Sequence, residues 1–92
     1  MKKKAVLLMV TSPTRDEAEN LGEALLAEGL AIRGSVIPVI HSFWLEAGRL
    51  ERSHEAMLLV TTNAATSKAA TAYIRDHDSF QASQIVSIAI AE

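Results

Sequence analysis

The stretch AVLLMVTSPTRDE at residues 5–17 decides the fold, because it contains the end of a strand and the start of a helix. Its apolar first half includes branched residues and is bounded by Ser12 and Pro13, a pattern typical of a strand buried on both faces. Thr14 and Glu17 then have the spacing of a capping box, in which the Thr14 hydroxyl accepts a hydrogen bond from the Glu17 backbone N–H. The stretch therefore predicts a strand over residues 5–11 and a helix that begins near Thr14.

The helix predicted after Thr14 has one apolar face. Ala18, Leu21, Gly22 and Leu25 recur at 100° per residue, and polar residues occupy the opposite side. Gly29 is a natural C′ residue for this helix. The pattern indicates an amphipathic surface helix that covers a sheet.

Two extended segments after Gly29 predict a hairpin. Residues 30–45 are rich in Val, Ile, Phe and Trp, and residues 50–62 form a second apolar run after the short turn at residues 46–49. Pro38 has no backbone donor, so we expect its part of the strand to lie at a sheet edge or at a bulge.

The remaining residues predict one more helix and one more strand. We expect Asn63 to cap a helix over about residues 64–77, and residues 85–90 to form the last strand. Periodicity leaves two apolar stripes open for this helix: Ala65, Ala69, Ala72 and Tyr73, or Ala70, Tyr73 and Ile74. The order βαββαβ predicts a single α+β domain over residues 1–92, a ferredoxin-like sandwich of an antiparallel sheet with two helices on one face.

The composition points to a surface that one copy of the chain does not cover. The chain has 92 residues, of which 49% are hydrophobic, and a chain of this length buries only roughly 60–65% of its unfolded surface. Residues 6–10, 56–60 and 85–90 are apolar on both sides of their strands, whereas two helices cover only one face of a sheet. We therefore expect a partner subunit to cover the second face.

Charge and cysteine content exclude several classes of function. The chain has no cysteine, which excludes a disulfide scaffold, an iron–sulfur site and a thiol nucleophile. The net charge of −2, with no aromatic residue in the central strands, argues against a nucleic-acid partner. The start MKKKAVLLMV imitates a secretory signal, but its apolar run is too short, and no segment has the length of a membrane span. We expect a cytoplasmic protein without a membrane partner.

The order of several short motifs resembles one known family. VTSP at residues 10–13 and LLAEGLA at residues 25–31 are similar to the opening of the CutA-type divalent-cation-tolerance proteins, members of the PII-like superfamily. The middle of the chain is similar to the family pattern I-P-G-x-x-S-x-Y-x-W-x-G-x-[IL]-E-x-x-x-E. The matching residues are Ile37, Pro38, Ser42, Gly48, Leu50, Glu51 and Glu55, with Trp44 and Phe43 in the aromatic region. The resemblance implies a homotrimer whose sheets pack together, with a non-enzymatic role in divalent metal tolerance or signalling.

The chain also departs from that family at identifiable positions. The family cysteine falls at Arg33, the glycine after the proline is Val39, and the lysine before the threonine is Thr61. The family signature H-P-Y-x-x-P-E-I aligns with residues 78–85, where only Phe80 and Ile85 remain similar. Family members run on beyond the position of Glu92. We therefore expect a divergent relative that is shortened at its C-terminus.

The candidate metal ligands are three histidines and a few carboxylates. They are His41, His54, His77, Glu51, Glu55, Asp76 and Asp78. His54 and Glu55 are neighbours on a strand and point to opposite faces, so they do not share one ion. A divalent metal ion is the only cofactor candidate, and the sequence assigns it no defined site.

No residue is predicted to be catalytic. The chain contains no Ser-His-Asp order, no HExxH and no glycine-rich phosphate loop. Glu51 and Glu55 would be about 13 Å apart on an extended strand, too far for a catalytic carboxylate pair. The resemblance implies instead that these two glutamates make hydrogen bonds between subunits.

An oligomer interface or a ligand cleft between subunits is the remaining kind of site. Its candidate residues are Trp44, Glu51, Glu55 and Phe80. The alternative function is a PII-like or ACT-like sensor that binds a small molecule between subunits.

Overall fold

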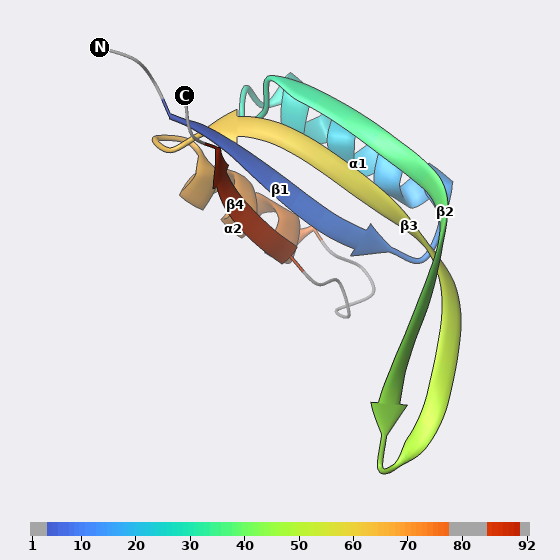
Figure 1. The fold of residues 1–92 in the computed structure, drawn as a ribbon. Helices are drawn as coiled ribbons and strands as arrows, with labels where there is room; N and C mark the ends of the chain where they lie inside the picture. Colours follow the sequence, from blue (N-terminus) through green and yellow to red (C-terminus); the bar gives the residue numbers. More distant parts are fainter. Residues whose placement is uncertain (1–3, 78–84, 91–92) are drawn as a thin grey trace.

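The chain forms the six elements that the sequence predicts, in the same order. A computed structural model describes residues 4–77 and 85–90. The elements are β1 (Ala5–Ser12), α1 (Arg15–Ala27), β2 (Arg33–Glu46), β3 (Arg49–Asn63), α2 (Ser67–Asp76) and β4 (Ile85–Ile90). Figure 1 shows both helices on one side of the sheet. The predicted α+β, ferredoxin-like fold is confirmed.

The four strands form one antiparallel sheet in the order β2-β3-β1-β4. β1 and β3 are therefore the central strands, which agrees with their apolar sequences. β2 and β4 lie at the two edges. Pro38 lies in edge strand β2, within a register shift between Ile37 and Ile40, so the predicted edge position and bulge are both confirmed.

The first helix begins and ends as its sequence predicts. Thr14 is the N-cap of α1, and its hydroxyl accepts a hydrogen bond of 3.2 Å from the Glu17 backbone N–H. At the other end Gly29 has a φ of 72°, and the Leu30 N–H donates to the Leu25 carbonyl at 2.9 Å. This is a Schellman motif, which needs a residue of positive φ at C′.

The core lies between the helices and the facing side of the sheet. Every second residue of the central strands is buried, as expected when one face is covered. The buried apolar residues are Val6, Leu8, Val10, Ala18, Leu25, Ala56, Leu58, Val60, Ala70 and Ile74. Ala70 and Ile74 belong to α2, so the structure selects the second of the two stripes that periodicity left open.

The predicted start of the second helix was wrong by one turn. The N-cap of α2 is Thr66, and Asn63 lies at the end of β3. The Asn63 side-chain oxygen accepts hydrogen bonds from the Thr66 backbone N–H at 3.0 Å and the Thr66 hydroxyl at 2.7 Å. Asn63 therefore closes the turn before the helix, a local role that Asn also favours.

The hairpin of β2 and β3 extends beyond the helix-covered part of the sheet (Figure 1). We call residues 40–55 the hairpin arm and the rest of the described chain the body. The arm contributes to an elongated molecule of 49 × 26 × 21 Å. Its two turn residues, Ala47 and Gly48, have φ values of 51° and 79°. Two consecutive positive φ values are what a two-residue type I′ hairpin turn requires.

Candidate functional site

The sheet face opposite the helices carries apolar side chains from all four strands. On the central strands these residues alternate with the core residues and are half-buried. On β4 the register places Val86 beside Met9 and Ile88 beside Leu7. We call this surface the open face and define it by Leu7, Met9, Ile37, Met57, Leu59, Val86, Ile88 and Ile90.

The open face leaves large apolar side chains exposed in one copy of the chain. Its edge residues Ile37, Val86 and Ile88 remain 43%, 49% and 44% exposed. Soluble monomers seldom leave a contiguous apolar patch of this kind in water. The surplus of apolar residues in the sequence is therefore located on this face.

The hairpin arm is the second exposed apolar region. Phe43 and Leu45 are 68% and 73% exposed, and Leu50 opposite Leu45 is 54% exposed. Figure 1 shows that neither helix reaches the arm. The apolar side chains of the arm are therefore left uncovered by the two helices.

The residues predicted for an interface or cleft lie mostly on the arm. Trp44 is directly opposite Glu51, and its indole N–H donates to a Glu46 carboxylate oxygen at 3.4 Å. Glu55 is half-buried opposite Ile40, on the same side of β3 as Glu51. Trp44, Glu51 and Glu55 thus share one face of the arm. Phe80 lies outside the described residues.

The three histidines fall into two different environments. His41 and His54 are directly opposite each other on the arm, and their ring centroids are 4.4 Å apart. His77 follows α2, where its ring stacks on Tyr73 at 3.9 Å and its Nδ1 lies 2.9 Å from the Tyr73 carbonyl oxygen. The structure therefore brings His41 and His54 together and keeps His77 separate. Asp76 is exposed at the end of α2, and Asp78 lies outside the described residues.

The pairing of His41 with His54 was missed from the sequence, although the turn contained the signal. A two-residue turn at Ala47 and Gly48 makes Glu46 and Arg49 the first pair of the ladder. Counting outward from that pair places His41 against His54. The sequence predicted the turn only as residues 46–49, which leaves this register undefined.

No larger group of metal ligands forms among the described residues of one copy. Among residues 4–77 and 85–90, no three His, Asp or Glu side chains converge so that they could hold a metal ion. A closed structural zinc site needs four protein ligands. One copy of the described chain therefore offers a divalent ion at most a partial set of ligands.

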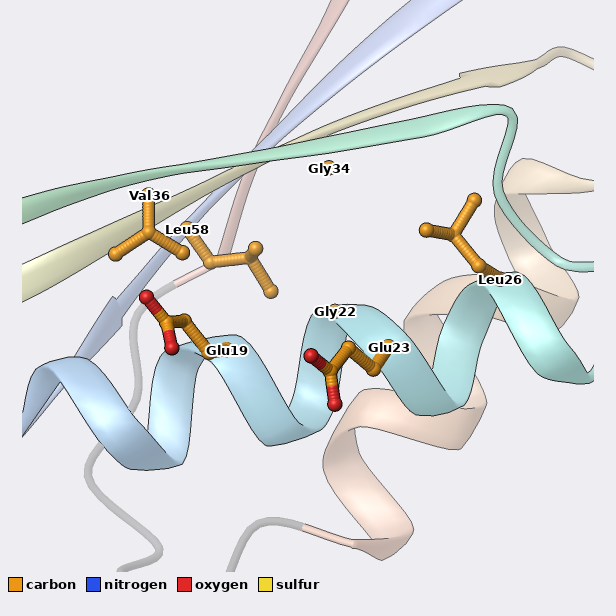
Figure 2. Close-up of a pocket in the computed structure, with 7 residues that line it drawn as sticks. All are labelled: Glu19, Gly22, Glu23, Leu26, Gly34, Val36 and Leu58. Carbon is orange, nitrogen blue, oxygen red and sulfur yellow. The ribbon is translucent and has the colours of Figure 1, made fainter.

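A shallow groove separates α1 from β2. Figure 2 shows its residues: Glu19, Gly22, Glu23, Leu26, Gly34, Val36 and Leu58. A Cβ at Gly22 would lie 3.0 Å from a methyl carbon of Leu58, so the glycine allows α1 to approach the sheet closely. The groove encloses about 260 Å³, slightly less than the roughly 300–1,000 Å³ typical of ligand pockets. The charged side chains among these lining residues are the carboxylates of Glu19 and Glu23.

The described helices are also too short or too polar to cross a membrane. α1 and α2 have 13 and 10 residues, whereas a spanning helix needs about 20.

Comparison with known proteins agrees with the resemblance noted in the sequence. The family model described as "CutA1 divalent ion tolerance protein" matches residues 6–92. Proteins named divalent-cation tolerance protein CutA from Yersinia pestis (strain Pestoides F) and Yersinia pseudotuberculosis serotype O:1b are each 27% identical over 88 residues, which cover 96% of this chain and 74% of theirs.

Solved structures show the same fold. The divalent ion tolerance protein CutA1 from Ehrlichia chaffeensis has a TM-score of 0.91 at 21% identity, covering 100% of this chain and 86% of that one. CutA1 from Oryza sativa has a TM-score of 0.89 at 19% identity, covering 98% and 83%.

Proposed function

The chain belongs to the CutA1 divalent ion tolerance family, and from this premise we propose that it is a non-enzymatic homotrimer that acts in tolerance or signalling of divalent metal ions in the cytoplasm. The Yersinia relatives named above carry divalent-cation tolerance in their names. The proposal transfers it to this chain together with a mode of assembly.

The open face is the observation that carries the proposed assembly. It spans all four strands and lies opposite both helices, so no element among residues 4–77 and 85–90 of the same copy covers it. Packing the open faces of several copies together removes this apolar surface from water in every subunit. The resemblance to CutA-type proteins supports three copies.

The hairpin arm supports the same proposal. Its exposed Phe43, Trp44 and Leu45 are large apolar side chains of the kind that anchor protein interfaces. An arm that reaches past its own body is positioned to contact a neighbouring copy. In this arrangement Trp44, Glu51 and Glu55 belong to contacts between subunits.

The small-molecule sensor considered from the sequence is not favoured. The matched family is CutA1, and the hairpin closes in a two-residue turn instead of a long ligand-binding loop. The groove beside α1 has two carboxylates at its edge and does not provide a basic grip for a phosphate.

The mass of the purified protein tests the assembly. Light scattering is expected to give three times the chain mass of 9.9 kDa. A mass of 9.9 kDa at micromolar concentration would contradict the proposed homotrimer.

Growth of a deletion strain tests the role. Loss of the gene is expected to lower tolerance to copper and zinc salts, and a plasmid copy is expected to restore it. Unchanged growth across a panel of divalent metals would contradict the role. Calorimetry with nucleotides and amino acids serves as the control, because tight binding of one of them without metal would favour the sensor.

A further inference from the structure

We propose that His41 and His54 together bind one divalent transition-metal ion, with Cu²⁺ preferred, across the two strands of the hairpin arm. The inference deepens the proposed function, on which its biological meaning rests. The binding itself rests on the geometry of these two side chains.

The register places both imidazoles on one side of the arm. His41 and His54 are direct partners in the antiparallel ladder, between the pairs Ile40–Glu55 and Ser42–Ser53. Side chains of directly opposite residues start with Cβ atoms about 4.5–5.5 Å apart and project to the same face. The two strands therefore hold the rings close together without help from any other element.

The distance between the rings is close to that of two imidazoles on one ion. With metal–nitrogen bonds of about 2.0–2.1 Å and an angle of roughly 90–110° between them, the ring centres are roughly 4.5–5.2 Å apart. The observed centroids are 4.4 Å apart, and the rings are tilted by 56°. Opening the pair by about 0.1 Å reaches the lower end of that range.

Both rings are available for coordination within one copy of the chain. In that copy His41 and His54 are exposed, and within the described residues neither makes a hydrogen bond or an ion pair. His77 provides the contrast, because its Nδ1 already lies against the Tyr73 carbonyl. Only the arm pair therefore combines two free imidazoles at a suitable distance.

The ligand type selects the metal. Imidazole nitrogen suits Cu²⁺, Ni²⁺ and Zn²⁺, whereas Mg²⁺ and Ca²⁺ prefer oxygen ligands. Cu²⁺ binds such sites most tightly among these ions, and its tetragonal geometry accepts two nitrogens at about 90°. Water fills the remaining positions, since no third protein ligand from the described residues converges on the pair.

One nearby charge opposes binding without filling the site. Arg52 lies two residues from His54 on the same side of β3, opposite Phe43. The side chain is exposed and long, so the guanidinium can turn into solvent when a cation binds. Its repulsion therefore weakens the site only moderately.

A bound ion would also join β2 to β3 near the start of the arm. An ion that binds only the paired strands stabilises them by an amount that grows with the logarithm of the ratio of metal concentration to Kd. The arm carries the exposed residues that we assign to contacts between subunits. The site therefore places divalent metal binding where it can strengthen the arm used in assembly.

Titration of the full chain with Cu²⁺ tests the site directly. Calorimetry is expected to give one ion per chain, and electron paramagnetic resonance is expected to show two nitrogen ligands. His41→Asn and His54→Asn are each expected to weaken binding by about tenfold or more, since even outer-shell changes commonly cost 10–100-fold. His77→Asn is the matched control and is expected to bind as the wild type does.

A second variant tests whether binding depends on the position of the histidine or only on the number of histidines. Adding Ser53→His to His54→Asn keeps the number of histidines but moves the ring to the other side of β3. It is expected not to restore binding. Wild-type affinity in His41→Asn or His54→Asn, or restored binding in the double variant, would overturn the proposed site.

The outcomes distinguish this site from the proposed function. If both single variants bind Cu²⁺ normally while the trimer mass and the deletion phenotype hold, the histidine site is wrong and the proposed function stands. If the pair binds Cu²⁺ but the deletion strain grows normally on metal salts, the site is right and the tolerance role is wrong.

Discussion

The body and the hairpin arm share the strands β2 and β3 but depend on different sources of burial. In the body, every second residue of β3 packs under the helices, and Leu58 is 1% exposed. In the arm, Leu50 on the same strand is 54% exposed. The side of the body under the helices is thus buried within one copy, whereas the apolar residues of the arm and the open face are not covered by the described residues of the same copy.

The largest effect on stability is expected when a leucine of the core is replaced by alanine, and the same replacement on the arm is the comparison. Leu58→Ala removes a buried side chain from the core and is expected to lower the free energy of unfolding by about 2–5 kcal/mol. Leu50→Ala on the arm is expected to change it by no more than about 0.5 kcal/mol at low protein concentration. Denaturant unfolding followed by circular dichroism measures both.

The concentration dependence sharpens this comparison. If the arm contacts another copy, the cost of Leu50→Ala rises with protein concentration, because assembly stabilises the folded state by mass action. Equal costs for the two variants at low concentration would contradict the distinction between body and arm.

The next effect is expected on assembly. Leu59→Lys puts a charge at the centre of the open face, where desolvation in an interface is costly. The variant is expected to have the mass of a single chain, 9.9 kDa, by light scattering. Leu26→Lys is the matched control, because Leu26 lies on α1 at 42% exposure and away from the open face. A variant at Leu59 that keeps the wild-type mass would show that the face is covered in another way.

Sequence reasoning succeeded where a local rule and a burial pattern agreed. The Thr14 cap, the Gly29 terminus, the bulge at Pro38 and a short turn within residues 46–49 each follow from backbone chemistry within a few residues. The apolar runs on both sides of β1 and β3 also predicted an uncovered face. These features could be predicted because each one is encoded locally.

The remaining features depend on tertiary contacts. Two apolar stripes on α2 were equivalent by periodicity, and only packing against the sheet selected Ala70 and Ile74. Asn63 has a strong capping preference, yet β3 extends to it and moves the helix start to Ser67. The pairing of His41 with His54 follows only once the turn is narrowed from residues 46–49 to Ala47 and Gly48, because the register of the two strands is counted from that turn.

A smaller effect on stability is expected from the N-cap of α1. Thr14→Ala removes the hydroxyl that accepts from the Glu17 N–H and is expected to cost about 1 kcal/mol of stability. Thr14→Ser keeps the hydroxyl and is the control, with a loss well below that of Thr14→Ala. The free energy of unfolding from denaturant curves measures both, and equal losses would show that the hydroxyl does not cap the helix.

The smallest effect is expected at the tip of the arm, where the turn chemistry is not optimal. Ala47 has a φ of 51°, a left-handed conformation that costs an alanine roughly 1–2 kcal/mol. Asparagine tolerates this conformation better, and Asn-Gly is the preferred pair in a type I′ turn. Ala47→Asn is therefore expected to stabilise the arm by somewhat less than about 1 kcal/mol.

The stability of the arm must be measured at the arm itself, because the helices do not cover the arm and it can open without unfolding the body. Hydrogen exchange at the arm amides is expected to slow in Ala47→Asn, while exchange in α1 and β1 stays unchanged. Gly48→Ala gives the opposite sign, because Gly48 has a φ of 79° that alanine adopts at a cost. Faster exchange throughout the body in Gly48→Ala would mean that body and arm unfold as one unit. The two regions would then differ in the exposure of their side chains but not in their stability against opening.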